Sequence, residues 1–92
     1  MCMIFEWDSE KAKINLQRHN ISFEEACLAF DDENLVDALD ESHSEAELRF
    51  NLIGLTEKGL LFVVYTERGD DVIRIISARK ATKFEEEIYV EK

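Results

Sequence analysis

The stretch that decides the fold is LLFVVYT, from Leu60 to Thr66. Apolar side chains occupy both faces of this predicted strand, which is typical of a central strand that needs cover on each side. Turns are predicted at 57–59 and 68–71, where glycine and charged residues interrupt the apolar pattern. Strands are expected over 48–56 and 72–78, so the sequence predicts an antiparallel meander centred on residues 60–66.

The N-terminal third predicts one short strand and two helices. The strand is expected over 3–7. A helix over about 9–19 follows Asp8, whose carboxylate can cap it, and ends at Asn20. A capping box at 22–25 begins the second helix. Its apolar face, at helical spacing, consists of Phe23, Ala26, Cys27 and Phe30.

The rest of the chain predicts a further strand and a further helix. Residues 35–39 suit a short edge strand, and a capping box of Thr82 and Glu85 begins a C-terminal helix that ends near Tyr89. The expected fold is therefore α+β. It has two N-terminal helices, an antiparallel meander of three to four strands and one C-terminal helix, in a single domain over 1–92.

One face of the predicted sheet lacks full cover. Helices at the two ends of the chain are expected to cover one face, which leaves Phe62, Val64 or their neighbours with only one short helix to shield them. This arrangement predicts either a concave site or a docking partner on that face.

Charge is unevenly distributed along a strongly acidic chain. The formal net charge is −10, and residues 31–47 contain eight acidic residues with no lysine or arginine. From Arg68 to Lys83 the balance reverses, with five basic residues against two aspartates. Because phosphate contacts dominate nucleic-acid affinity, the acidity disfavours a stand-alone DNA-binding regulator. It leaves a focused site at Arg49 and the basic segment.

Nothing in the sequence indicates a membrane segment, a metal or a cofactor. No apolar run approaches the roughly 20 residues that span a bilayer, and the N-terminus lacks a signal-peptide layout, so we expect a cytoplasmic protein. Cys2 and Cys27 have no CxxC spacing and are expected to be buried or incidental thiols. The chain has no proline, so turns are expected at its three glycines, Gly54, Gly59 and Gly69, and at Asn/Asp-rich stretches.

Two positions are candidates for chemistry because their residue types are unusual where they stand. His43 is a candidate general base that Glu47 would orient; the alternative is a loop histidine beside solvated acids. Arg74 interrupts an apolar strand, so it either lines a site or is paired, for example with Glu47 or Glu67.

Further cations gather near the predicted C-terminal helix and on the first helix. Arg79 and Lys80 would hold a phosphate with the N–H groups of that helix, or else belong to a surface turn. Lys11 and His19 lie roughly on one side of the first helix. Such a set suits metal-independent cleavage of RNA, in which the 2′-hydroxyl attacks and the protein supplies a base, an acid and cations.

The sequence resembles the BrnT family of toxins nearly end to end. The most specific part of the resemblance is SARKA, from Ser77 to Ala81. The other matching positions, in chain order, are 5–8, Lys11, Asn15, 18–19, 21–26, 30–31, Asp40, 43–44, 47–49, Gly54, 65–68 and 73–76.

The resemblance implies a RelE-like toxin of a type II toxin–antitoxin system, an endoribonuclease that cleaves mRNA, inhibits translation and arrests growth. It implies a BrnA-type antitoxin with a ribbon-helix-helix portion, in a heterotetramer of two toxins around an antitoxin dimer, and contact with operator DNA only through that antitoxin. It implies no cofactor. Catalytic positions under this resemblance are His43, Glu47, Arg68, Arg74 and Arg79, and RNA-binding positions are Arg49, Lys80, Lys11 and His19.

A second hypothesis keeps the partner and drops the catalysis. In it, the chain is a BrnT-like module that binds its antitoxin and takes part in autoregulation of the operon, with weak or no ribonuclease activity. The net charge of −10 favours this hypothesis, whereas the His, Glu and Arg set favours the ribonuclease.

Overall fold

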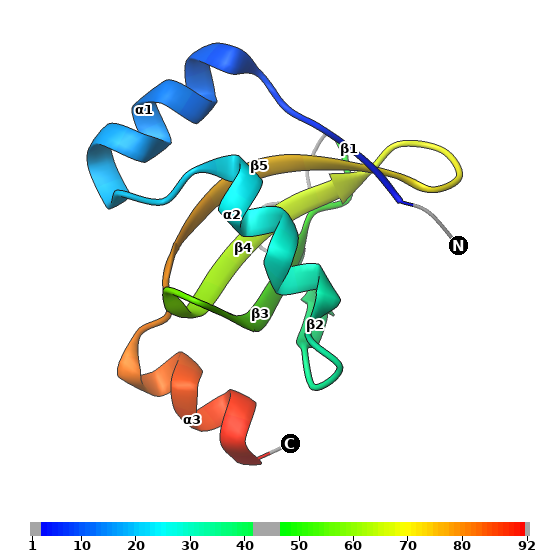
Figure 1. The fold of residues 1–92 in the computed structure, drawn as a ribbon. Coiled ribbons are helices and arrows are strands. Elements are labelled where there is room, and N and C mark those ends of the chain that lie inside the picture. Colours follow the sequence, from blue (N-terminus) through cyan, green and yellow to red (C-terminus); the bar gives the residue numbers. More distant parts are fainter. Residues whose placement is uncertain (1–2, 42–46, 92) are drawn as a thin grey trace.

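Five strands form one sheet in the part of the chain that the computed structural model describes, residues 3–41 and 47–91 (Figure 1). Their order across the sheet is β1-β5-β4-β3-β2. The strands are β1 Ile4–Glu6, β2 Val36–Leu39, β3 Phe50–Thr56, β4 Gly59–Glu67 and β5 Val72–Lys80. The predicted central strand is confirmed, because β4 contains residues 60–66 and has two strands on either side.

The expected antiparallel sheet of three to four strands is wrong in size and in kind. The segment β1 joins as a fifth strand, and it pairs with β5 in parallel, with Ile4 opposite Val72 and Glu6 opposite Arg74. The other three pairings, β2 with β3, β3 with β4 and β4 with β5, are antiparallel. A parallel pairing between segments so far apart in the chain leaves no local pattern in the sequence, whereas hairpins do.

Three helices begin where the sequence predicts them. The first, α1 Ser9–His19, begins after Asp8, whose carboxylate accepts hydrogen bonds from the N–H groups of Glu10 and Lys11 at 2.8 and 3.1 Å, and ends at Asn20 with φ 58°. The second, α2 Phe23–Leu28, has the predicted capping box and continues into a 3₁₀ turn over Ala29–Asp31. The third is α3 Lys83–Glu91. No helix of the described residues is long and apolar enough to cross a bilayer.

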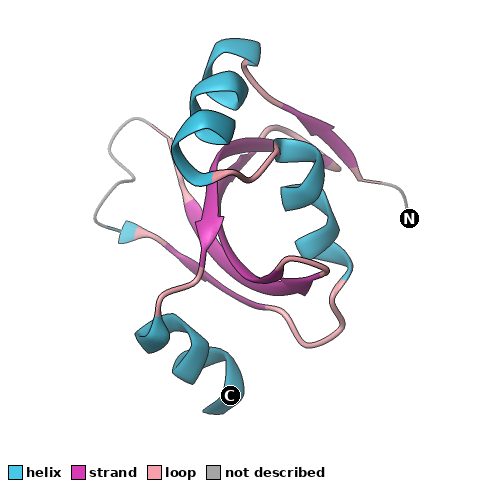
Figure 2. Ribbon diagram, turned by 60° about the vertical axis from the view of Figure 1, so that its left-hand side comes forward, coloured by secondary structure: helices cyan, strands magenta, loops and turns pink. Residues whose placement is uncertain are grey.

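The core lies between one face of the sheet and the helices α1 and α2. Figure 1 shows α2 lying across β4 and β3, and Figure 2 shows the sheet curling around it. The largest fully buried side chains among the described residues are those of Phe23, Ile21, Leu52, Leu61, Ile75 and Val63. Burial of these apolar groups accounts for most of the stabilisation, at about 1.5–3 kcal/mol for a large side chain.

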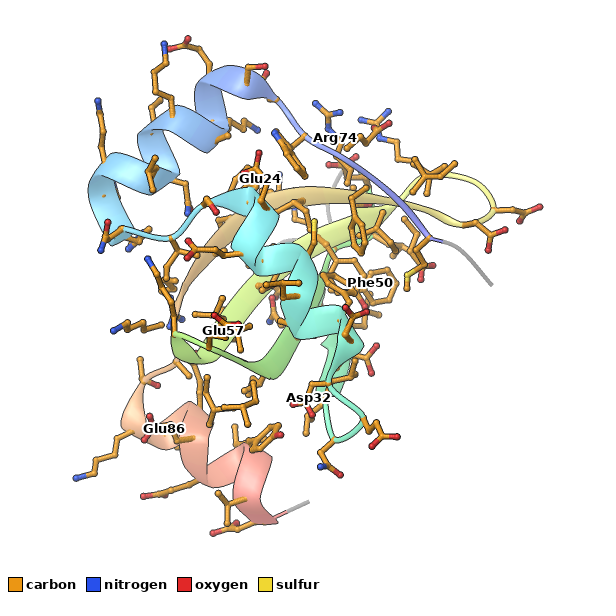
Figure 3. The ribbon with its side chains drawn as sticks, viewed as in Figure 1. Glu24, Asp32, Phe50, Glu57, Arg74 and Glu86 are labelled. Atoms are coloured by element: carbon orange, nitrogen blue, oxygen red, sulfur yellow. The ribbon has the colours of Figure 1, made fainter. Side chains whose placement is uncertain are left out.

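One of the contacts that fasten the third helix to the sheet is made by the carboxylate of Asp32. Asp32 accepts hydrogen bonds from the Leu55 N–H at 2.8 Å and from the Tyr89 hydroxyl at 2.6 Å. It belongs to the α2–β2 connection, on the side toward α3 (Figure 3). That bond to Asp32 raises the pKa of Tyr89 above its ordinary value. No residue of α3 is buried, so this helix lies on the sheet rather than in the core.

Asn15 is the polar centre of the helix–sheet contact. Its buried amide nitrogen donates to the Ala78 carbonyl at 2.8 Å and to the Ile21 carbonyl at 3.0 Å, and its oxygen accepts from the Ala78 N–H at 3.1 Å. One side chain thus satisfies three backbone groups on two elements, and it fixes α1 against β5.

We predict that Asn15→Ala lowers the free energy of unfolding by about 2–4 kcal/mol, because it leaves buried backbone groups of Ala78 and Ile21 without a hydrogen-bond partner. Urea denaturation followed by circular dichroism measures this change. The matched control is Gln17→Ala, at an exposed position of the same helix, which should change stability by less than about 0.5 kcal/mol. Equal effects of the two substitutions would contradict the role given to Asn15.

Gly54 corrects one expectation, since it lies inside β3 and not at a turn. A Cβ at this position would overlap the carbonyl oxygen and Cβ of Ala29. The glycine therefore allows the 3₁₀ turn to approach β3 closely, whereas Gly59 and Gly69 are at turns with positive φ, as expected.

We predict that Gly54→Ala destabilises the protein by about 2–3 kcal/mol, because the added methyl group meets backbone that cannot move freely. Gly69→Ala serves as the comparison, since its surroundings are open and only its φ of 67° is strained. That substitution should cost about 1 kcal/mol. Thermal unfolding of both variants tests the predicted order, and a reversed order would contradict it.

Candidate functional site

The face of the sheet turned away from α1 and α2, here called the outer face, contains a groove of about 400 Å³. This outer groove lies on β3, β4 and β5, and it includes Phe62 and Val64, the residues for which the sequence predicts a concave site. Its full lining is Asp40, Arg49, Asn51, Phe62, Val64, Ile76, Ser77 and Arg79. Two predicted site residues, Arg49 and Arg79, therefore line the same groove.

A β-bulge shapes this part of the sheet. Val64 pairs with Ser77 and Tyr65 with Ile75, so Ile76 is the extra residue on β5. A bulge bends its strand and redirects the side chains on either side of it, which is why bulges recur beside functional sites.

A second groove adjoins the first across this bulge. It has a volume of about 160 Å³ and lies between α1 and β5; we call it the helix groove. Ile76 and Ser77 line both grooves. The remaining lining is Lys11, Ile14, Asn15, Arg18 and His19, so Lys11 and His19 share one side of α1, as expected, and that side faces β5.

Arg79 is held rigidly in the outer groove. Its Nη1 and Nη2 donate to the two carboxylate oxygens of Glu85 at 2.8 and 2.9 Å, and its guanidinium carbon lies 4.3 Å from the centre of the Phe62 ring. The hydrogen bonds to Glu85 raise the pKa of Arg79. Burial alone would raise the pKa of Glu85, but hydrogen bonds from Arg79 and the Thr82 N–H hold it below its usual value.

The phosphate position predicted at the start of α3 is filled by the chain itself. Glu85 also accepts the Thr82 N–H at 2.8 Å, which completes the predicted capping box. A carboxylate therefore stands where the sequence predicts a phosphate between Arg79, Lys80 and the helix N–H groups. Lys80 is exposed and lines none of the grooves described here, and only its carbonyl oxygen meets Arg79.

Polar groups other than the arginines also face the outer groove. The side-chain oxygen of Asn51 is buried and has no hydrogen-bond partner among the described residues. The Asp40 N–H donates to the Arg49 carbonyl at 2.8 Å. This hydrogen bond joins the residue before β3 to the residue after β2. An orphaned polar oxygen in a groove is a group that a bound ligand or water can satisfy.

Arg74 is paired, as one of the alternatives predicted, but its partner is neither Glu47 nor Glu67. Its Nη1 donates to Glu6 at 3.0 Å, and Arg68 approaches the same carboxylate at 3.9 Å. Figure 3 places Arg74 beside β1, and the register of β1 on β5 explains the pairing, because Glu6 and Arg74 are direct neighbours. This ion pair was missed because it depends on the parallel strand.

The remaining predicted residues are at the other end of the sheet or outside the described residues. Glu47 and Arg68 line a groove of about 400 Å³ with Leu48, Phe50, Thr66 and Glu67, apart from the outer groove. His43 lies outside the described residues, and so does Cys2. Cys27 is half-buried, and burial raises the pKa of its thiol to about 11, which fits the predicted incidental thiol.

A further cavity of about 600 Å³ is lined by Glu67, Asp70 and Asp71 together with Met3, Gly69, Val72 and Ile73. Three carboxylates and no cation make it unsuitable for a polyanion. The two adjoining grooves are therefore the candidate site.

Sequence reasoning missed four residues of that site: Arg18, Asn51, Ser77 and Glu85. Arg18 directly precedes His19 in the family resemblance, and Ser77 begins its most specific stretch, so both could have been proposed. Asn51 had a weaker signal, as a polar residue on an apolar strand. Glu85 was interpreted only as a cap, and nothing in the sequence shows that a cap also binds an arginine.

The same fold is found in a known family of proteins. A family model described as "Ribonuclease toxin, BrnT, of type II toxin-antitoxin system" matches residues 7–85. Among solved structures, the chain is similar to the 1.1 Å crystal structure of the Brucella abortus ribonuclease toxin BrnT, at a TM-score of 0.66 and 22% identity. The match covers 88% of this chain and 99% of that one, and it shows a shared fold. A comparison with curated proteins finds no match.

We predict that Glu6 and Arg74 stabilise the fold through their contact. In a double-mutant cycle of Glu6→Gln and Arg74→Gln, the coupling energy should be about 0.5–1 kcal/mol, as for a partly exposed ion pair. Urea denaturation of the four proteins gives this value. Additive effects of the two substitutions would show that the contact contributes nothing.

Proposed function

The chain belongs to the BrnT family of ribonuclease toxins of type II toxin–antitoxin systems, and from this membership we propose that it is an endoribonuclease that cleaves mRNA. Its activity would inhibit translation and arrest growth, as in a RelE-like toxin. The observation that supports this proposal best is the pair of adjoining grooves. It brings cations from α1 and β5, and Arg49 just before β3, to one surface of an acidic molecule.

The cations of the two grooves suit a single RNA strand. Arg49 and Arg79 face the outer groove, and Lys11 and Arg18 face the helix groove, with Ser77 between the two sets. Arginine and lysine side chains hold phosphates through charge-assisted hydrogen bonds. A strand that crosses the bulge would meet both sets in turn, which supports RNA as the ligand.

Cleavage would use the RNA's own 2′-hydroxyl as nucleophile. The hydroxyl attacks the adjacent phosphorus, the 5′-oxygen leaves, and the products end in a 2′,3′-cyclic phosphate and a 5′-hydroxyl. The protein must remove a proton, donate a proton and stabilise the charge of the pentacoordinate phosphorus, and this chemistry needs no metal. We assign charge stabilisation to Arg79. The general base that the sequence suggests, His43 oriented by Glu47, stays a proposal from the sequence alone.

The toxin–antitoxin family implies a protein antitoxin, and we propose that it is BrnA-type. Its ribbon-helix-helix portion would bind operator DNA, and the complex would be a cytoplasmic heterotetramer of two toxins around an antitoxin dimer. The acidity of this chain fits a toxin that meets DNA only through its partner.

A second candidate function is an antitoxin-binding module with weak or no catalysis that takes part in operon autoregulation. It is favoured by the ion pairs of Arg74 with Glu6 and of Arg79 with Glu85, because the neighbouring carboxylate offsets part of each arginine's attraction for a phosphate. It predicts a tight complex with the antitoxin and harmless expression of this chain alone.

We predict that the purified protein cleaves an mRNA transcript in the presence of EDTA and leaves 2′,3′-cyclic phosphate ends. Arg79→Ala should slow cleavage about a hundredfold or more, because it removes a charge-stabilising donor. Gel analysis of end-labelled RNA measures both, and induced expression tests growth arrest and its relief in the variant.

Lys11→Ala and Lys13→Ala provide a matched pair of controls. Both remove one positive charge from α1, but only Lys11 lines the helix groove. Lys11→Ala should weaken RNA binding, and Lys13→Ala should not. Absence of cleavage by the folded wild-type protein, together with normal growth during soluble expression, would favour the second candidate function.

A further inference from the structure

The contact between Arg79 and Glu85 leaves one edge of the guanidinium available. Glu85 accepts one hydrogen bond from each terminal nitrogen of the guanidinium, Nη1 and Nη2. The second hydrogen of Nη1 is donated to the Lys80 carbonyl at 3.1 Å. Among the described residues, nothing accepts a hydrogen bond from Nε or from the second hydrogen of Nη2. These two donors form the side edge of the fork, which matches two oxygens of a phosphate.

The position of this edge is fixed from two directions. Phe62 lies under the guanidinium plane at 4.3 Å, and Glu85 is anchored at both of its oxygens, by Arg79 and by the capping box of α3. The Glu85 side chain is only 13% exposed, against 35% for Arg79, so the anchor is the more shielded partner. An arginine held in this way loses little further conformational freedom when it binds a phosphate.

We propose that Arg79 forms a phosphodiester subsite of the outer groove and that Glu85 is its positioning residue. The subsite takes one backbone phosphate of single-stranded RNA on the Nε and Nη2 edge of Arg79. This inference rests on the proposed ribonuclease function. It also makes α3 part of the site, because the same carboxylate begins the helix and orients the arginine.

Neutralising Glu85 is expected to change the RNA affinity in opposite directions, depending on whether Glu85 positions Arg79 or only repels RNA. If Glu85 only repelled RNA, its neutralisation would strengthen binding, because the substitution removes a negative charge beside the groove. If Glu85 positions Arg79, neutralisation weakens binding, because the arginine becomes mobile over Phe62. The two interpretations predict opposite signs for one substitution.

The experiment measures binding of a single-stranded 2′-O-methyl oligonucleotide, which lacks the attacking hydroxyl, to the full chain. Glu85→Gln should weaken binding roughly three- to tenfold, the effect of freeing one immobilised side chain. Glutamine can serve in a capping box, so this substitution keeps the start of α3. Arg79→Gln should also lower the slope of log affinity against log salt by about 0.7, the loss of one phosphate contact on a single strand.

Two controls separate positioning from other effects. Glu86→Gln removes the same charge one residue further along α3, where the side chain is exposed, and Figure 3 marks its place on the helix. It should leave the affinity unchanged or slightly higher. Thr82→Ala removes the hydroxyl cap but keeps both hydrogen bonds between Glu85 and Arg79, so it tests whether weakening comes only from fraying of α3.

Weaker binding in Glu85→Gln, with Glu86→Gln and Thr82→Ala near the wild type, supports the proposal. Unchanged or tighter binding in Glu85→Gln overturns it, as does an equal loss in Thr82→Ala. In both of those cases wild-type cleavage of RNA persists, and the proposed function stands. A wild-type protein that neither binds nor cleaves RNA overturns the proposed function and this inference with it.

Discussion

The placement of α1 on the sheet depends on the hydrogen bonds of one buried amide, that of Asn15. By bonding both backbone groups of Ala78 and the Ile21 carbonyl, it joins α1, the α1–α2 turn and β5 at a single point. Ala78 lies just beyond the bulge at Ile76, so the amide also fixes where the bent strand meets the helix. Asn15 also lines the helix groove, so this contact helps to hold Lys11 and Arg18 beside β5.

The electrostatics of the molecule are local. A net charge of −10 opposes RNA at long range, but at physiological salt such repulsion is screened beyond about 8 Å. Within that distance the ion pairs decide what each arginine can do. Glu6 and Arg74 pair across the β1–β5 register, whereas the contact with Glu85 leaves one edge of Arg79 open in the outer groove. The first ion pair therefore joins two strands, and the second positions an arginine at the proposed site.

The parts that could be predicted from the sequence are those with local signals. Asp8, Ser22 and Thr82 each begin a helix because capping is a contact between near neighbours, and 60–66 is central because its two faces are both apolar. The parallel pairing of β1 with β5 has no local signal in the sequence. Glu6 was therefore not predicted as the partner of Arg74, because the two residues meet only through that pairing. The double role of Glu85 was missed for a related reason: a capping box is visible in four residues, but its contact with β5 requires the fold. The site was predicted as residue types, and the structure divides them among separate grooves.

The central claim is that RNA crosses the bulge of β5 and contacts both grooves at once. The most direct measurement is the change in backbone amide chemical shifts when a 2′-O-methyl oligonucleotide is added to the isotopically labelled protein. The account predicts changes at Asn51, Ser77 and Arg79 together with Lys11 and Arg18, saturating at one common affinity. Changes confined to the acidic cavity around Asp70 and Asp71, or to one groove alone, would contradict it.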